Sequence, residues 1–184
     1  RTAVDVAIAG GGLAGAALAT RLAAAGRRVI VVERDPFPRD KLCGEFLSPE
    51  SESQLRALGC WPAIEAAGPV AMRQARFVSP GGRTIEMPLP GRALGVRRYT
   101  LDAAILAQAA AQGAEVVQPA SVESLEPTRL AWRPVGDATT RFAPGDAEPA
   151  PTGEPQTIDA RYVVGAFGRQ ARIDPRRGSR PPRT

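Results

Sequence analysis

A glycine-rich segment near the start of the chain constrains the fold more than any other feature. Residues 10–15 read Gly-Gly-Gly-Leu-Ala-Gly, and an apolar run rich in β-branched residues, 4–9, precedes them. After the glycines, apolar residues recur at helical spacing over 14–25, and a second apolar run, 29–32, ends at the acidic Glu33. This order of strand, glycine turn, helix, strand and acid predicts a βαβ unit with the length of a dinucleotide-binding site.

Each position of the glycine motif has a physical role. Gly10 permits the tight turn out of the first strand, Gly12 lets a pyrophosphate approach the backbone, and Gly15 lets the helix pack against the sheet. The free N–H groups that begin the helix, at Leu13 and Ala14, face the phosphates, and the helix dipole favours the negative charge there. The motif therefore predicts where a diphosphate binds.

Glu33 stands at the end of the second predicted strand. A carboxylate at this place can accept hydrogen bonds from both ribose hydroxyls of an adenosine, and it repels a 2′-phosphate, so NADP is disfavoured. The alternative is a glycine-rich turn in an ordinary α/β domain. The motif by itself does not decide between FAD and NAD.

The basic character of the chain is concentrated near its end. The net charge is +5 and the pI is about 10.2. Residues 169–184 hold six of the 24 basic residues and one of the 19 acidic residues, so the preceding part is neutral. Because no basic patch is predicted on the domain itself, we expect no nucleic-acid binding.

The chain contains no histidine and only two cysteines, Cys43 and Cys60. This composition excludes Ser-His-Asp and Cys-His catalysis within the 184 residues, and we expect no metal site. Two cysteines fit a reducing compartment, no apolar stretch is long enough to cross a membrane, and no leader precedes the first strand, so a cytoplasmic protein is predicted. Redox chemistry would have to come from a cofactor.

A loop with an unusual composition follows the acid. Residues 37–45 read Phe-Pro-Arg-Asp-Lys-Leu-Cys-Gly-Glu, and the prolines and alternating charges predict a loop rather than another βα element. This segment leaves the carboxyl end of a parallel strand beside the glycine turn, where open α/β sheets bind ligands. The alternative is a solvated surface loop.

The glycine motif, Glu33 and the 37–45 loop together resemble the FAD-dependent oxidoreductases that include geranylgeranyl reductases and aromatic-ring monooxygenases. The resemblance implies an α/β fold: a Rossmann-like FAD/NAD(P)-binding domain with a parallel sheet, plus a partial antiparallel β layer of the substrate domain. It implies that the βαβ unit holds the ADP half of FAD and that 39–45 runs along the flavin. Arg98, four residues before Asp102, would contact the cofactor, and Asp102 would help to fix a helix start; alternatively, Arg98 is simply solvated.

The resemblance and the motif together give one set of expected cofactor-binding residues: Gly10, Gly12, Leu13, Ala14, Gly15, Glu33, Arg34, Arg39, Lys41, Cys43, Gly44, Glu45, Arg98 and Gly168. No residue is assigned a catalytic role. The resembled family has an acidic residue before a glycine in a motif linked to NAD(P)H use, and Phe167 stands there instead. NAD(P)H is therefore a weaker candidate as electron donor than FAD is as cofactor.

The remaining pattern predicts the order of elements. Parallel strands are expected at 4–9, 29–33, 114–118 and 161–166. Helices are expected at 48–58 with Ser48 as the cap, at 61–67, and from a Thr100 cap to Gly113, with strand pairs at 73–87 and 121–132. The FAD-binding domain would span 1–173 and be incomplete, with 70–96 in the substrate-side β layer, 133–156 a flexible insertion and 174–184 a disordered tail.

The function predicted from the sequence is that of the N-terminal part of a flavin-dependent oxidoreductase. It would be a monooxygenase or an isoprenoid-type reductase acting on a small apolar or aromatic molecule, and the fragment alone would be inactive. Two alternatives stay open: a nicotinamide-dependent dehydrogenase without flavin, and an inactive nucleotide-binding fragment. The sequence does not indicate an oligomeric state.

Overall fold

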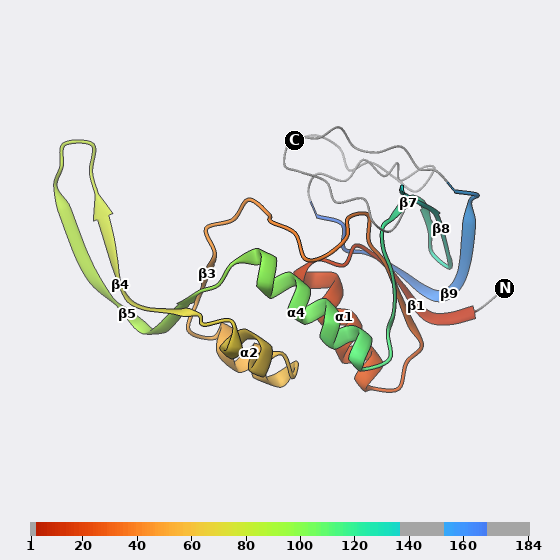
Figure 1. Cartoon of the computed structure of the whole chain (residues 1–184), viewed down its shortest axis with the longest axis horizontal. Helices are drawn as coiled ribbons and strands as arrows, with labels where there is room; N and C mark the ends of the chain where they lie inside the picture. Colours follow the sequence, from red (N-terminus) through yellow and green to blue (C-terminus); the bar gives the residue numbers. More distant parts are fainter. Residues whose placement is uncertain (1–2, 137–152, 169–184) are drawn as a thin grey trace.

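A mixed sheet forms the centre of the computed structural model, which describes residues 3–136 and 153–168 (Figure 1). In spatial order its strands are β6 (Glu115–Val117), β2 (Val29–Val32), β1 (Ala3–Ala9), β9 (Gln156–Gly165), β8 (Arg129–Pro134) and β7 (Ala120–Glu126). The first four pair in parallel and the last two are antiparallel. The predicted α/β class and its four parallel strands are confirmed.

The central strands are apolar because both faces of the sheet are covered. All four residues of β2 are buried, as expected for a parallel strand between two layers. On one face, Val6 and Ile8 of β1 join a core with the helices α1 (Leu13–Ala24) and α4 (Arg98–Ala111). Figure 1 shows these two helices side by side. On the other face, Leu130 and Trp132 of β8, a later strand of the same sheet, pack with Ala7 of β1 in a second core.

The ends of the helices test the predicted caps. Gly26 follows α1 with a φ of +74°, which agrees with the predicted stop. The proposed Thr100 cap is wrong: α4 begins at Arg98 after an extended Arg97, so Thr100 lies inside the first turn. The Ser48 cap is also wrong, because the Ser51 N–H donates to the Ser48 carbonyl in a turn that comes before α2 (Ser51–Ala57). A short α3 (Trp61–Ala66) follows.

A second sheet extends away from the first. It consists of β3 (Phe46–Leu47), β5 (Thr84–Gly95) and β4 (Val70–Val78), all antiparallel, and the β4–β5 hairpin projects from the body in Figure 1. The antiparallel layer is confirmed, although both strands are longer than predicted. One face of the hairpin carries exposed apolar side chains, including Phe77 and Ile85. Its assignment to a substrate domain stays a prediction.

The segments predicted to be irregular fall mostly outside the described residues. The expected insertion, 133–156, overlaps the end of β8 and the first residue of β9, and its part 137–152 lies outside them. The expected tail, 174–184, also lies outside them. Within the described residues, no helix combines the length and the apolar character that a bilayer crossing requires.

Ile105 of α4 tests the packing of the helical layer. Its side chain is 4% exposed within the core between α4 and the sheet, whereas Ile85 on the hairpin is 67% exposed. We expect Ile105→Ala to lower the free energy of unfolding by about 2–5 kcal/mol through a lost apolar contact and a cavity. Ile85→Ala should change it by less than about 0.5 kcal/mol. Urea unfolding measures both, and equal losses would contradict this packing.

Candidate functional site

The turn between β1 and α1 admits only glycine at two positions. Gly10 has a φ of +107°, and a Cβ there would lie 2.6 Å from the carbonyl oxygen of Ala166 at the end of β9. A Cβ on Gly15 would lie 1.9 Å from the Gly10 carbonyl oxygen. Gly15 therefore lets α1 pack against the turn itself, which refines the predicted contact with the sheet.

Gly12 leaves a space beside the start of α1. Apart from Gly12 itself and its two chain neighbours, the one described atom within 4 Å of a Cβ built at Gly12 is the Lys41 ammonium nitrogen, at 3.4 Å. Gly12 is the N-cap of this 12-residue helix, whose first turn has no side-chain cap and no acidic residue. The N–H groups of that turn can therefore bind an anion from outside the helix.

Glu33 closes the site from the end of β2. Its carboxylate is 6% exposed and accepts hydrogen bonds from the Gly11 N–H at 2.6 Å and the Asp35 N–H at 3.1 Å. These bonds tie the glycine turn to the strand beside it. Because each carboxylate oxygen has two acceptor sites, Glu33 keeps capacity to accept hydrogen bonds from a ligand.

A buried ion cluster lies on the α4 side of the turn. Asp102 has no exposed surface, and its carboxylate receives two hydrogen bonds from Arg98, at 2.6 and 2.8 Å, and an ion pair from Lys41 at 2.8 Å. Burial raises the pKa of Asp102, but the hydrogen bonds from Arg98 and Lys41 together outweigh this effect. The pKa of Asp102 therefore lies below its ordinary value. Asp102 does not open α4, since it stands one turn inside the helix, and its two hydrogen bonds hold Arg98, the first residue of α4.

Ion pairs and contacts with an aromatic ring hold further cationic side chains in the loop after β2. Asp35 pairs with Arg39 at 2.7 Å and with Arg34 at 3.2 Å. The Lys41 ammonium lies 4.5 Å from the centroid of the Phe37 ring, a cation–π contact that restricts the lysine side chain. The Phe37 N–H donates to the side chain of Gln118, which anchors the loop beside β6.

The segment 43–45 leads from the loop after β2 to the second sheet. The Glu45 N–H donates to the Cys43 sulfur at 3.4 Å, and Glu45 has a φ of +55°, in the left-handed region. The hydrogen bonds from the Glu45 N–H and from Arg98 lower the pKa of the Cys43 thiol below its ordinary value. The Glu45 carbonyl accepts a hydrogen bond from Val96, so the segment leads directly into the second sheet.

An open cavity of about 1270 Å³ lies at the carboxyl ends of β1, β2 and β9. Its lining includes every predicted cofactor-binding residue except Gly15, Cys43, Gly44 and Glu45. Gly15 is covered by the turn, and the other three belong to the segment that leaves the loop. Sequence reasoning missed the part of the wall formed by Ala120, Ser121 and Val122, because no local motif indicates that β7 returns beside Glu33.

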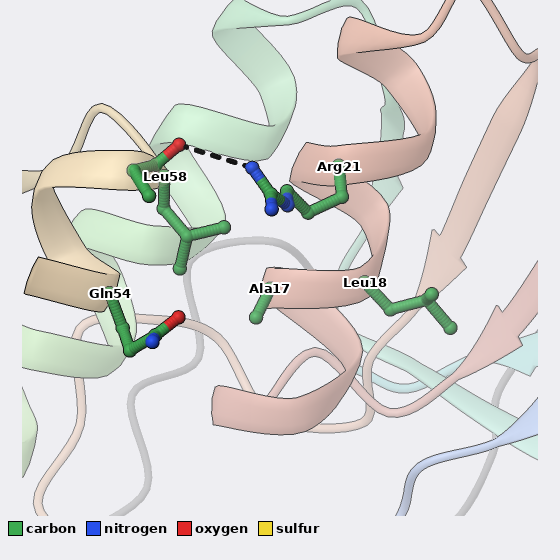
Figure 2. Close-up of a pocket in the computed structure, with 6 residues that line it drawn as sticks. Ala17, Leu18, Arg21, Gln54 and Leu58 are labelled. Carbon is green, nitrogen blue, oxygen red and sulfur yellow. Dashed lines mark hydrogen bonds between the residues drawn. The ribbon is translucent and has the colours of Figure 1, made fainter. Parts of the chain in front are cut away.

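A second hollow lies between α1 and α2. Figure 2 shows Ala17 and Arg21 of α1 on the side toward Gln54 and Leu58. Leu18 also lines the hollow, whose volume is about 350 Å³. Arg21 donates to the carbonyl of Ala57 across it, and none of the acidic residues in 3–136 and 153–168 lines it. This small groove is separate from the glycine turn, so it is the weaker candidate site.

Comparison with known sequences decides the family. Residues 3–182 match the sequence model of a family described as an FAD binding domain. The chain belongs to this family. A match over nearly the whole chain agrees with the resemblance found in the glycine motif, Glu33 and the 37–45 loop.

Relatives of this FAD-binding domain include two named redox enzymes. The menaquinone reductase of Mycolicibacterium smegmatis is 36% identical over 121 residues, which are 63% of this chain and 29% of the relative. Squalene epoxidase 3 of Arabidopsis thaliana is 50% identical over 58 residues, which are 32% of this chain and 11% of the relative. The chain therefore spans well under two thirds of the length of these relatives.

A solved structure shares the fold of the FAD-binding domain. The myxobacterial chondrochloren halogenase CndH, described as a new variant of FAD-dependent halogenases, superposes with a TM-score of 0.77 at 24% identity. The match covers 94% of this chain and 39% of the halogenase. At this identity the likeness supports the fold alone.

Within the glycine turn, Gly15 and Gly12 differ strongly in their surroundings and provide a test. Gly15→Ala brings a Cβ against the Gly10 carbonyl, so we expect it to lower the free energy of unfolding by about 1–3 kcal/mol. Gly12→Ala makes only an ordinary van der Waals contact with the Lys41 ammonium at 3.4 Å, so its loss should stay below about 1 kcal/mol. Urea unfolding of both variants checks the order, and a larger loss for Gly12→Ala would contradict it.

The ion cluster predicts a pH dependence of stability. Because the pKa of Asp102 is lower in the folded chain than in the unfolded one, its contribution is fully present above about pH 4 and is lost as pH falls through the folded pKa. Removing one partner of a buried pair costs about 3–5 kcal/mol, so Asp102→Asn should be less stable at neutral pH. We expect the difference between the two proteins to narrow in acid. Urea unfolding from neutral to acidic pH measures this, and a constant difference would count against it.

Proposed function

We propose that the cavity beside the glycine turn binds FAD and that the chain is the FAD-binding part of a flavin-dependent oxidoreductase. The observation that carries the proposal is the buried hydrogen bond between the Gly11 N–H and the Glu33 carboxylate. It brings an anion-binding helix start and a ribose-binding acid to one wall of the cavity. The family match over residues 3–182 supports the same cofactor.

The lining residues fit the separate parts of such a cofactor. The start of α1 and the open space at Gly12 suit the diphosphate, and Glu33 suits the adenosine ribose. Arg98 and Lys41 add positive charge on the α4 side. The cavity, at about 1270 Å³, exceeds the roughly 300–1,000 Å³ of common small-molecule sites, which favours a large dinucleotide.

When bound, a flavin would supply the redox chemistry, either hydride transfer or the activation of oxygen. The residues of this chain would bind and orient it. Phe167 and the exposed Leu42 give the cavity an apolar part beyond the charged one. We infer a small apolar substrate of isoprenoid or aromatic type, in keeping with the names of the menaquinone reductase and the squalene epoxidase among the relatives.

Two finer points belong to the same proposal. NAD(P)H is the candidate electron donor, although Phe167 occupies the position where the resembled family has an acid. A reducing compartment such as the cytoplasm fits the two free thiols of Cys43 and Cys60.

Titration of the full chain with FAD, FMN and NAD tests the proposal. We expect FAD to bind more tightly than FMN, because FMN lacks the adenosine that Glu33 would hold. Glu33→Gln should weaken FAD binding on the order of tenfold by loss of a charged acceptor, and should leave FMN binding unchanged. Flavin fluorescence and isothermal calorimetry provide the measurements.

The controls separate the alternatives. Glu50→Gln removes an exposed acid at the start of α2, away from the cavity lining, and should leave FAD affinity unchanged. Tighter binding of NAD than of FAD would favour a nicotinamide-dependent enzyme. Absence of binding to either dinucleotide would overturn the proposal for this chain.

A further inference from the structure

We propose that Asp102 is a positioning residue: it holds the Lys41 ammonium over the glycine turn, where this ammonium binds the diphosphate of the ligand. This inference rests on the proposed function, because it requires an adenine dinucleotide at that turn. It concerns three segments that are distant in the sequence. Lys41 lies in the loop after β2, Asp102 in α4, and Gly12 at the start of α1.

The position of the Lys41 ammonium is the first observation. It lies 2.8 Å from an Asp102 oxygen, 4.5 Å from the centroid of the Phe37 ring and 3.4 Å from the Cβ position at Gly12. A lysine has a flexible four-carbon stem whose ordering costs conformational entropy. Here a carboxylate and a ring restrict that stem before any ligand binds, so the ammonium already lies where a phosphate would approach Gly12.

The charge balance of the cluster is the second observation. Arg98 and Lys41 carry two positive charges against the single negative charge of Asp102, which has no exposed surface. Both Asp102 oxygens are already bound by Arg98, and one of them also binds Lys41. The cluster thus keeps one excess positive charge, and Lys41 is its member beside Gly12.

The two possible roles of Asp102 predict opposite changes in the affinity for a diphosphate when Asp102 is replaced by Asn. If only the net charge mattered, Asp102→Asn would raise the positive charge by one and would tighten the binding of a diphosphate. If Asp102 positions the ammonium, the same change releases Lys41 into solvent and weakens the binding. The direction of the change in affinity therefore distinguishes positioning from simple electrostatics.

A second cluster on the same chain provides matched controls. Glu52 of α2 also pairs with two cations, Arg56 at 2.8 Å and Arg92. It lies at the surface and outside the cavity lining. Glu52→Gln and Arg92→Met therefore make the same changes of charge as Asp102→Asn and Lys41→Met without touching the glycine turn.

The experiment measures the binding of ADP and of adenosine to the full chain by isothermal calorimetry at low salt. We expect Lys41→Met to weaken ADP binding about tenfold, the loss of one charge-assisted hydrogen bond, and to leave adenosine binding unchanged. Asp102→Asn should weaken ADP binding and not tighten it. The double variant should bind ADP within about twofold of Lys41→Met, because coupled residues are not additive. Both control variants should bind ADP as the wild type does.

Several results would overturn the inference. Tighter ADP binding by Asp102→Asn would show that charge alone matters, and unchanged ADP binding by Lys41→Met would show that Lys41 does not bind the diphosphate. If circular dichroism finds Asp102→Asn unfolded, the comparison of ADP with adenosine binding in Lys41→Met still decides the role of the ammonium. Asp102→Glu, which keeps the charge and moves the carboxylate, then takes the place of Asp102→Asn in the binding measurement. If the wild type binds neither ADP nor adenosine, the proposed function is overturned as well. If the wild type binds ADP and Lys41→Met binds it equally well, only the present inference is overturned.

Discussion

The hydrogen bond from the Gly11 N–H to the Glu33 carboxylate is the interaction on which the site depends. β1 and β2 are parallel neighbours, with Ile8 beside Val31, so their carboxyl ends lie at the same edge of the sheet. The glycine turn follows β1, and Glu33 follows β2. A buried carboxylate without partners would be costly, and the Gly11 and Asp35 N–H groups remove that cost. The turn and the acid therefore stabilise each other before any ligand binds.

Asp102, on the α4 side of the turn, is a second buried carboxylate whose partners offset the cost of its burial. It has no exposed surface, yet it lies between the cations Arg98 and Lys41, which compensate its charge. Removal of Asp102 would leave both cations without their shared counter-ion in a poorly solvated place. The cluster joins α4 to the loop after β2 through one carboxylate, and it holds the Lys41 ammonium beside the start of α1.

Much of the fold could be predicted from periodicity alone, and the errors concern where the elements begin and end. The runs at 4–9 and 29–32 are apolar because both faces of their strands are covered, which is a strong local signal. The caps at Ser48 and Thr100 failed because a cap depends on where the backbone leaves the extended conformation, and tertiary contacts shift that point by two or three residues. The β4–β5 hairpin was underestimated in length, because the end of β5 pairs with β3 as well as β4.

The sequence by itself determined the glycine turn, the acid at Glu33 and the parallel strands that bring them together. These features depend on residues within about 30 positions of each other, where steric limits and strand geometry leave few alternatives. Only the tertiary structure decided that Asp102 binds Lys41 and that β7 brings Ala120 to Val122 beside Glu33. These contacts join segments about 60 to 90 residues apart in the chain, and such pairing follows from how the helices and strands pack across the sheet, which no local pattern encodes.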